Sequence, residues 1–595
     1  MMSSKNIAPP NIGDYETARR EYALDVPELF NYTVDVFEKW ARQEPGRTAL
    51  LVGSADWNTI ESHSFGQLSA RINRCCNLLR SLGIVKGQRV LVLMGWRADW
   101  YVAMLAMIKL GIIPIPTTTQ SRPRDLLYRF EVSGAVGVIS SAELAGVVDE
   151  IAARCPTLAH KIVVGAAAPR PGWIDCAAAL AAQSETFDNW QSTRSDDHML
   201  IYFTSGTVAY PKMVLHTQAS YGIGHRLTAE LWHDLKPTDT HWTMTDTGWG
   251  KAVWGCLFGQ WTVGATVFVS AAPKFEPQKT LTMIGRIGVT SFCAPPTVYR
   301  ILVRDNLDNY DLSSLRHCTS AGEPLNGEVI RIWRGATGLD IHDGYGQTET
   351  VNVLANYRCF PVKPGSMGKP VPGFDVLIVD DDIRPLPDGN EGHIAIRIKP
   401  NRPVGFFAGY LNDEESTAAA FRGDFYLTGD RAYRDSDGYF WFDSRADDVI
   451  ITSGYRIGPF EIESALIEHP AVKESAVVAS PNVLRGEIVK AFVVLADGYE
   501  PSAALVGELQ QHVRSITAPY KYPRAIEFVK ELPKTISGKI KRRELRQREW
   551  AGWRGGMRVR PRRRYRRTYR RLGLLALLER LRRSLFRPRA ATRTR

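Results

Sequence analysis

From its first residues to about residue 445, the chain alternates short apolar runs with amphipathic helical patterns. The run RVLVLMG at 89–95 is followed by the helical pattern WYVAMLAMIKLG at 100–111. Three further runs are rich in β-branched residues and bounded by Gly, Pro or Asp, as strands are: KIVVG at 161–165, TVFVS at 266–270 and DVLIVD at 375–380. Apolar strands that alternate with helices predict α/β layers with buried, largely parallel strands.

A shorter unit of mixed pattern begins after Arg445. It contains a helical pattern from Pro459 to His469, the strand-like runs SAVVAS (475–480) and VKAFVVL (489–495), and a second helix from about Ala503 to Ser515. We therefore predict a large α/β N-terminal domain at 1–445, a smaller α+β C-terminal domain at 446–550 and a separate tail at 551–595.

Composition puts the 595 residues among ordinary folded proteins. The chain is 44% hydrophobic and 23% charged, which excludes collagen-like, low-complexity and disulfide-scaffold proteins. Its eight cysteines are scattered without a CxxC pair, which is typical of buried thiols in a reducing compartment and implies no structural zinc. The N-terminus has no signal-peptide or transit-peptide pattern, and no apolar stretch reaches the length of a membrane span. We expect a cytoplasmic protein.

The net charge of +12 is unevenly distributed along the chain. Residues 551–595 contain 17 Arg, no Lys and one Glu, a net of +16, so residues 1–550 carry a net of −4. A mildly acidic body does not favour general nucleic-acid binding. Arguments about charged partners therefore apply to the tail alone.

The segment YFTSGTVAYPK at 202–212 has the composition of a phosphate-binding loop. Small hydroxylated residues around a glycine let backbone N–H groups and hydroxyls approach phosphate oxygens, and a lysine supplies charge. The candidates are Thr204, Ser205, Gly206, Thr207 and Lys212. Their spacing does not fit the GxxxxGK[ST] pattern of P-loop NTPases. Taken alone, the segment is equally compatible with a Ser/Thr turn before a strand.

Three other segments carry candidate chemistry. In DGYGQTE at 343–349, a tyrosine between glycines could stack on a base while Thr348 and Glu349 meet a phosphate or Mg²⁺, although an ordinary loop is the alternative. In YLTGD at 426–430, Asp430 follows a glycine turn and could accept ribose hydroxyls or simply cap that turn. In LPKTISGKIKR at 532–542, Lys539 follows a Ser-Gly turn, where a solvated basic loop is the alternative.

The order and spacing of these segments, with SRADDVIITSGYRIGPFEIE at 444–463, resemble the signature motifs of the adenylate-forming superfamily, which includes acyl-CoA synthetases. The resemblance extends from about residue 30 to 550. Within the superfamily the chain is most similar to medium-chain acyl-CoA synthetases, through DTGWGK (246–251), GYGQTET, PGSMGKPVPGFDV, RPVGFFAGY, HPAVKESAVVASP and TAPYKYPR. The resemblance implies layered α/β sheets with a small β-barrel-like part in the large domain.

The resemblance also implies an ATP-dependent acid-thiol ligase that uses Mg²⁺. Such an enzyme forms acyl-AMP from a carboxylic acid, here a medium-chain fatty or simple aromatic acid, and passes the acyl group to coenzyme A. Because one anion attacks another, cations are needed where charge develops. Lys539 would therefore bridge the carboxylate and the α-phosphate, with Thr348 near that phosphate and Glu349 near Mg²⁺.

By the same resemblance, the remaining motifs bind the nucleotide. Segment 204–212 would hold the β- and γ-phosphates. Asp430 would accept the ribose hydroxyls with Arg445 assisting, and Arg456 would lie near the phosphates. The adenine would be flanked by Gly322, Glu323, Asp343, Gly344, Tyr345, Gly346 and Gln347.

The resemblance implies that the C-terminal domain rotates about Asp447 between two half-reactions. Basic residues of the rotated domain suit the phosphates of coenzyme A. Coenzyme A would be met by Gln120 from the large domain and by Ser453, Gly454, Tyr455, Arg485, Arg514, Tyr522, Pro523 and Arg524. Trp249, with Thr348, would line the acyl pocket, although Trp249 could also be plain core.

One departure from the family pattern lies in the phosphate loop. A hydroxyl and a glycine are usual where this chain has Val208 and Ala209. The lost hydroxyl removes a potential hydrogen bond worth about 1 kcal/mol or more, and alanine is unfavourable if the position needs a positive φ. We expect activity with weakened ATP binding. Two alternatives stay open: an acyl-AMP ligase that loads a carrier protein, and a catalytically impaired homologue that binds nucleotide or acyl groups.

The resemblance ends at Ala551. Residues 554–571 contain a dense Arg cluster with interleaved Tyr565 and Tyr569, and apolar residues then recur at near-helical spacing from Leu572 to Phe586. A basic amphipathic helix of this kind is typical of binding to an anionic membrane surface. An acidic partner protein or nucleic acid would satisfy the same charges, and a solvated tail without a partner is the remaining interpretation. We expect no specific nucleic-acid binding.

Overall fold

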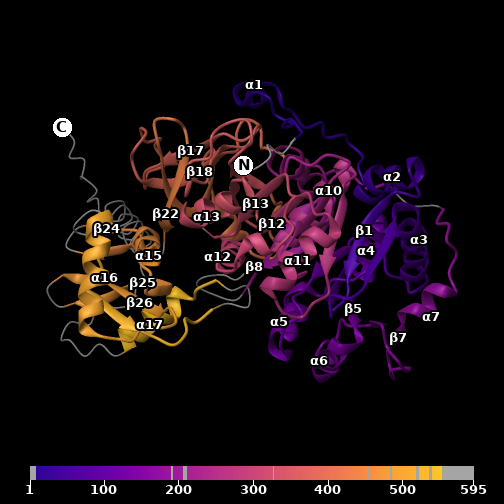
Figure 1. Ribbon diagram of the computed structural model, residues 1–595. Helices are drawn as coiled ribbons and strands as arrows, with labels where there is room; N and C mark the ends of the chain where they lie inside the picture. Colours follow the sequence, from indigo (N-terminus) through magenta and orange to yellow (C-terminus); the bar gives the residue numbers. More distant parts are fainter. Residues whose placement is uncertain are drawn as a thin grey trace, which may run out of the picture. The chain divides into compact units, whose positions relative to one another are not determined.

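The computed structural model describes residues 8–188, 192–204, 211–323, 325, 327–446, 448–452, 455–482, 485–517, 521–534 and 539–551. Within these residues the strands form five sheets, all in one compact unit that ends at Arg546 (Figure 1). Layers of mainly parallel strands covered by helices confirm the predicted α/β class.

The largest sheet has nine strands and carries most of the candidate site at one edge. From one side to the other they are β16 (Lys369–Pro370), β15 (Asn352–Ala355), β14 (Ile341–Gly346), β13 (His317–Ala321), β12 (Ser291–Ala294), β10 (Thr240–Thr243), β11 (Thr266–Ser270), β1 (Thr48–Gly53) and β2 (Ile60–Ser64). The strands from β14 to β1 pair in parallel, and the outer pairs are antiparallel. Its connecting helices include α9 (Gly250–Cys256), α10 (Phe258–Val263), α11 (Pro277–Ile287), α12 (Pro296–Leu302) and α13 (Gly327–Thr337).

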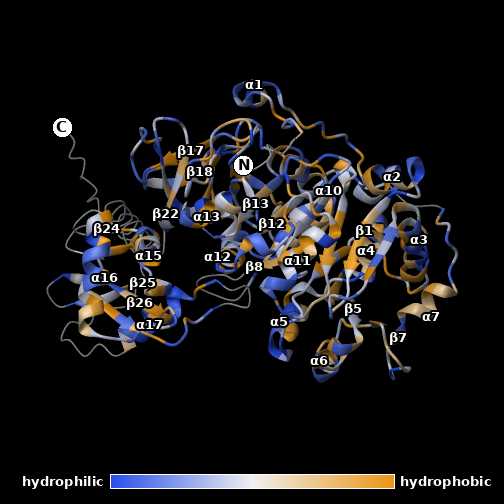
Figure 2. Cartoon of the chain, viewed as in Figure 1, coloured by the Kyte–Doolittle hydropathy of each residue, from blue (hydrophilic) through white to orange (hydrophobic). Residues whose placement is uncertain are grey.

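A second sheet is entirely parallel. Its order is β4 (Ile113–Pro116), β3 (Arg89–Leu93), β5 (Gly137–Ser141), β6 (His160–Val164) and β7 (Ile174–Asp175). The helices of this part are α3 (Phe65–Ser81), α4 (Ala98–Leu110), α5 (Pro123–Ser133), α6 (Ala142–Ala152) and α7 (Cys176–Ala181). Helix α4 is mostly apolar and buried along nearly its whole length, and hydrophobic colour is concentrated around it and β1 (Figure 2).

Two smaller antiparallel sheets complete the part of the molecule before residue 446. One has the order β19 (Gly409–Tyr410), β9 (Lys212–Thr217) and β8 (His198–Thr204). The other, the barrel-like part, contains β17 (Val376–Val379), β18 (Gly392–Arg397), β21 (Phe425–Arg434), β20 (Phe421–Arg422) and β22 (Phe440–Arg445). The predicted strand at 375–380 is therefore correct, but it lies in an antiparallel sheet.

A fifth sheet forms the α+β unit after Arg445. It contains β24 (Tyr455–Ile457), β23 (Ile450–Thr452), β26 (Gly486–Leu495), β25 (Val472–Asn482) and β27 (Ala525–Phe528), with helices α15 (Pro459–Ile467) and α16 (Ala503–Ile516), followed by α17 (Arg542–Ala551). The two predicted helices and two predicted strands of this region are present with small shifts at their ends. The exact domain boundaries at 445 and 550 stay predictions.

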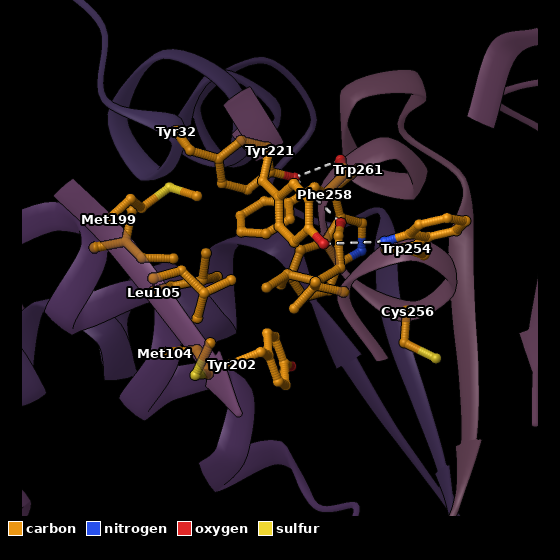
Figure 3. Close-up of a cluster of buried hydrophobic side chains, with 14 of the residues drawn as sticks. Tyr32, Met104, Leu105, Met199, Tyr202, Tyr221, Trp254, Cys256, Phe258 and Trp261 are labelled. Carbon is orange, nitrogen blue, oxygen red and sulfur yellow. Dashed lines mark hydrogen bonds between the residues drawn. The ribbon is translucent and has the colours of Figure 1, made fainter. Parts of the chain in front are cut away.

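The main core brings aromatic side chains from distant segments together (Figure 3). The Tyr32 hydroxyl donates to the carbonyl of Phe258 at 2.7 Å, and Trp254 Nε1 donates to the Tyr221 hydroxyl at 3.3 Å. Such internal partners remove the cost of burying these polar atoms. None of the helices in the described residues combines the length and apolar character that crossing a membrane requires.

Candidate active site

The phosphate segment lies between two antiparallel strands. Thr204 ends β8, Lys212 begins β9, and these two residues pair directly across the hairpin. Ser205, Gly206 and Thr207 lie outside the described residues, as do Val208 and Ala209. The hairpin thus holds the two ends of the predicted segment side by side, and the Tyr128 hydroxyl fixes its approach by donating to the carbonyl of Pro211 at 2.9 Å.

The predicted adenine-flanking residues lie at the carboxyl ends of two neighbouring parallel strands. Gly322 and Glu323 come after β13, and Asp343 to Gly346 form the end of β14. Because carboxyl ends of parallel strands meet at one edge of the sheet, the two segments lie together there. Gly322 has φ +108°, a conformation that favours glycine. The Glu323 carboxylate accepts hydrogen bonds from Arg300 at 2.9 Å and Thr297 at 3.1 Å.

Asp343 has a buried carboxyl group in the end of β14. Its Oδ1 has no hydrogen-bond partner among the described residues. Burial raises the pKa of Asp343 well above its usual range, and the Gly344 backbone N–H and the Lys251 charge oppose that rise. A buried acceptor without a donor fits a ligand that brings its own N–H group, as the amino group of adenine would.

Asp430 is the centre of a hydrogen-bond network. Its Oδ2 accepts from the Tyr345 hydroxyl at 2.5 Å and from Gln347 Nε2 at 2.9 Å, while Arg445 Nε lies 3.2 Å from Oδ1. Gln347 is held in turn by the Tyr426 hydroxyl, which donates to its Oε1 at 2.9 Å. Burial raises the pKa of Asp430, and Arg445 is the strongest influence in the opposite direction.

The local backbone at Asp430 differs from the predicted glycine turn. Gly429 lies within β21 at a bulge, where the register to β18 changes between Leu427 and Arg431. Its φ of +77° is one that glycine adopts without strain. The bulge redirects the strand so that Asp430 pairs with Arg445 of β22. The motif DGYGQTE likewise begins on a strand, β14, rather than in a loop.

Thr348 and Glu349 follow β14 and are anchored by the core. The Thr348 carbonyl accepts from the Tyr221 hydroxyl at 2.6 Å and from His216 Nε2 at 2.7 Å. Burial lowers the pKa of His216 to about 3, which keeps its ring neutral. The Glu349 carboxylate accepts from the Tyr410 hydroxyl at 2.8 Å. These contacts fix both motif residues relative to β9 and β19.

Glu349 has the chemistry of a single Mg²⁺ ligand. Loss of surrounding water raises its pKa, and the Tyr410 hydrogen bond and the charges of Arg445 and Lys212 only partly oppose this. No group of three or more His, Cys, Asp or Glu side chains suited to a metal occurs in the described residues. Mg²⁺ is commonly held by one or two carboxylates together with substrate phosphates, so the site fits a metal that arrives with a nucleotide.

Lys539 shares its electrostatic surroundings with these carboxylates. Its pKa is lowered, first by loss of surrounding water and then by the charges of Arg445 and Lys251, while Glu323 and Asp430 raise it. The side chain nevertheless keeps exposed surface. Lys539 is therefore an exposed cation whose charge acts on Asp430 and Glu323.

Trp249 immediately precedes α9 and is half-buried, so it is not simply core. The following residue, Gly250, packs so closely that an added Cβ would lie 3.3 Å from the Thr348 side chain. The preceding residue, Gly248, is packed against the backbone of Thr117 and Thr118 after β4. The predicted pocket residues Trp249 and Thr348 thus lie on adjoining segments.

This packing makes Gly248 intolerant of a side chain. A Cβ at this position would overlap the backbone of Thr118, so we expect Gly248→Ala to lower the free energy of unfolding by about 1–3 kcal/mol in urea titrations. Gly335 of α13 is a matched control, because an added Cβ there meets nothing within 4 Å. Gly335→Ala should leave stability unchanged or raise it by about 0.5–1 kcal/mol. Equal effects of the two changes would contradict the close approach.

The structure brings together three of the residues predicted to bind coenzyme A. The Arg514 guanidinium lies 3.7 Å from the centre of the Tyr522 ring, and Arg524 donates to the Tyr522 hydroxyl at 2.8 Å. Pro523 lies between the latter two in sequence. Arg485 immediately precedes β26, and Gln120 follows β4 in the large domain. Tyr455 and Arg456 belong to β24, while Ser453, Gly454 and the hinge residue Asp447 lie outside the described residues.

Sequence reasoning missed several residues that organise the site. Tyr410 ends the quoted motif RPVGFFAGY and Tyr426 begins the quoted segment YLTGD, but the sequence does not show which carboxylate or amide a strand tyrosine meets. Arg300 lies within an apolar helical pattern that gives no signal. Lys251 lies inside the quoted motif DTGWGK and donates to the carbonyl of Ala321 at 3.0 Å, directly before Gly322, which is predicted to flank the adenine. Membership of a quoted motif was therefore the available signal for Lys251, Tyr410 and Tyr426.

The chain is similar to known proteins along most of its length. The family described as AMP-binding enzyme matches residues 37–411, and its C-terminal domain matches residues 461–539. The mitochondrial acyl-coenzyme A synthetase ACSM3 of Mus musculus is 44% identical over 553 residues, which cover 92% of this chain and 95% of that protein. The mitochondrial acyl-coenzyme A synthetase ACSM4 of Homo sapiens is 46% identical over 553 residues, which cover 91% and 94%.

Two solved structures show the same architecture. The anthranilate CoA ligase AuaEII, in complex with anthranoyl-AMP, has a TM-score of 0.81 at 31% identity and covers 88% of this chain and 98% of its own. A benzoate CoA ligase from Burkholderia xenovorans LB400 has a TM-score of 0.77 at 29% identity and covers 87% and 100%. With the matched motifs and the site geometry, these similarities establish that the chain belongs to the AMP-binding enzyme family.

Proposed function

We propose that this protein is an ATP-dependent acyl-CoA synthetase, an acid-thiol ligase that works through an acyl-AMP intermediate. The observation that carries the proposal is the buried Asp430 carboxylate, which lies 3.2 Å from Arg445 and whose charge also acts on Lys539. The names of the sequence relatives and the anthranoyl-AMP in a solved relative support it.

In the first half-reaction, a carboxylate oxygen of the acid attacks the α-phosphorus of ATP, and the bond from that phosphorus to pyrophosphate breaks. Lys539 would neutralise the two approaching anions, which otherwise repel each other. Thr348, anchored through its carbonyl by Tyr221, would orient the α-phosphate. Mg²⁺ held by Glu349 would supply positive charge to the phosphates.

The nucleotide would be oriented by its ribose and base. Asp430, already aligned by Tyr345 and Arg445, would accept the ribose hydroxyls. Asp343 would accept from the adenine amino group, with Gly322 and Glu323 alongside the base. The hairpin ends Thr204 and Lys212, with the loop between them, would hold the terminal phosphates, and Arg456 would assist.

In the second half-reaction, the thiol of coenzyme A loses its proton to solvent and its sulfur attacks the acyl carbon. The bond from that carbon to the phosphate oxygen breaks, and AMP leaves with the electrons. We propose that residues 446–550 rotate about Asp447 to bring a second face to the site. The cluster of Arg514, Tyr522 and Arg524 supports this face as a phosphate-binding surface, because guanidinium groups bind phosphates with directed hydrogen bonds.

The acid would enter beside Trp249 and Thr348. A half-buried tryptophan offers a flat apolar wall that suits aliphatic chains and simple aromatic rings. The two solved relatives are named for anthranilate and benzoate, both aromatic acids. We therefore propose a medium-chain fatty or simple aromatic acid as substrate.

Pyrophosphate release tests this proposal. Purified protein is assayed with ATP and Mg²⁺ across a panel of acids from acetate to dodecanoate and including benzoate, with and without coenzyme A. We expect pyrophosphate release to depend on one class of acid. We also expect the enzyme to turn over only when coenzyme A is present. Turnover only with an acylatable carrier protein would instead favour the carrier-loading alternative. If folded protein that binds ATP releases no pyrophosphate, the result would favour the impaired homologue. Val208 and Ala209 would then be the first residues to test as the cause of the lost activity.

Two further proposals concern the cellular location of the protein and the partner of its C-terminal tail. The relatives' names include the word mitochondrial, whereas the sequence predicts a cytoplasmic protein. Residues 552–595 lie outside the described residues, and binding of their Arg cluster to an anionic membrane rests on sequence alone. Co-sedimentation with phosphatidylserine vesicles should retain the full chain and release one that ends at residue 551; equal retention would contradict the proposal.

A further inference from the structure

Tyr410 contacts two residues assigned to different parts of the ATP site. We infer that Tyr410 is a positioning residue that links Lys212 to Glu349. Its ring supports the binding of ATP without a metal. Its hydroxyl supports the gain in ATP affinity that Mg²⁺ brings. This inference rests on the proposed function and assigns a role to a residue that sequence motifs left without one.

Both contacts of Tyr410 are direct. Its hydroxyl donates to Glu349 Oε1 at 2.8 Å, and the Lys212 ammonium lies 4.5 Å from the centre of its ring. Phe407 packs edge-on against the ring at 5.0 Å between centres, and the Tyr410 backbone N–H donates to Thr417 at 2.9 Å. Phe407 therefore packs against the ring and Thr417 fixes the backbone, while the ring and hydroxyl meet the lysine and the carboxylate.

Strand pairing explains why one residue reaches both. Tyr410 of β19 pairs with Val214 of β9, so Lys212 is its diagonal neighbour on the same face of that strand pair. A few residues earlier, Phe407 N donates to the Glu349 carbonyl at 2.8 Å. The short segment 405–411 is thus hydrogen-bonded to the Glu349 loop at one end and to β9 at the other.

The two contacts have separable physical effects. The face of an aromatic ring attracts an ammonium group, so the ring restricts where Lys212 lies before ATP arrives. The hydroxyl hydrogen bond engages one oxygen of Glu349 and orients the carboxylate toward a metal. Phenylalanine keeps the first effect and removes the second, whereas leucine removes both.

Calorimetric titration with ATP, in EDTA and in excess MgCl₂ and without any acid, tests the inference. Tyr410→Phe should bind ATP in EDTA within about twofold of the unchanged protein, but its gain in affinity on adding Mg²⁺ should fall by about three- to tenfold. Tyr410→Leu should show the same reduced gain and, in addition, about two- to fivefold weaker binding in EDTA.

Tyr439 provides the matched control. Its hydroxyl donates to the Pro361 carbonyl at 2.6 Å and the Lys363 ammonium lies 4.6 Å from its ring centre, so it repeats both contact types away from the candidate site. Tyr439→Phe should leave both titrations unchanged. A Tyr410→Phe variant with an unchanged Mg²⁺ gain, or with EDTA binding as weak as that of Tyr410→Leu, would overturn the inference. Failure of the unchanged protein to bind ATP at all would instead overturn the proposed function, and this inference with it.

Discussion

Replacement of Lys539 by alanine is expected to lower acid-dependent pyrophosphate release by about 10³-fold, because a cation aimed at developing charge in a site depleted of water is worth several kcal/mol. The loss should appear in kcat rather than in the KM for ATP, since the lysine acts where the two anions approach each other. Single-turnover pyrophosphate release with saturating ATP and acid measures the effect.

Two further measurements give this expectation a specific meaning. Transfer from chemically prepared acyl-AMP to coenzyme A should proceed in Lys539→Ala, because that half-reaction does not need the lysine in the proposed mechanism. Lys541 lies two residues away, just before α17, and is ion-paired with Glu544 at 3.8 Å. It provides the control, and Lys541→Ala should retain full activity. Equal losses in both half-reactions would contradict the assigned role and indicate a structural defect.

The second large effect is expected at Asp430. Asp430→Asn keeps the shape of the side chain but removes the charge that faces Arg445 and accepts from Tyr345. Hydrogen bonds to charged groups contribute about 1.5–3 kcal/mol each, so we expect the KM for ATP to rise by about ten- to a hundredfold with a smaller change in kcat. Initial-rate kinetics at saturating acid and coenzyme A measure this.

Asp435 supplies the comparison for that substitution. It lies after β21, accepts from Lys363 at 2.7 Å and from Trp441 at 3.0 Å, and is distant from the Asp430 network in its contacts. Asp435→Asn should leave the KM for ATP unchanged, and thermal unfolding of both variants reveals any general loss of stability. A rise in KM that is the same for both variants would exclude a specific role for Asp430 in ribose binding.

Some strands and motifs could be predicted from the sequence, whereas the direction of strand pairing could not. The strand at 266–270 was predicted at its observed bounds, because apolar β-branched residues between polar ones leave few alternatives. The ordered motifs predicted the family, which the comparisons confirm. In contrast, the strand at 375–380 gave no sign of its antiparallel partners, since pairing direction depends on residues far away in the chain.

The candidate site likewise has features that the sequence predicted and features that only the tertiary structure shows. Sequence order and spacing predicted which segments carry chemistry, from the Thr204 hairpin to Lys539, because motif residues must supply particular functional groups to a ligand. Only the tertiary structure decided that a bulge at Gly429 directs Asp430 to Arg445, and that Tyr410 lies between Lys212 and Glu349. Those arrangements depend on strand register and on contacts between residues that are tens to hundreds of positions apart in the chain. Local patterns of hydrophobic and polar residues do not predict such contacts.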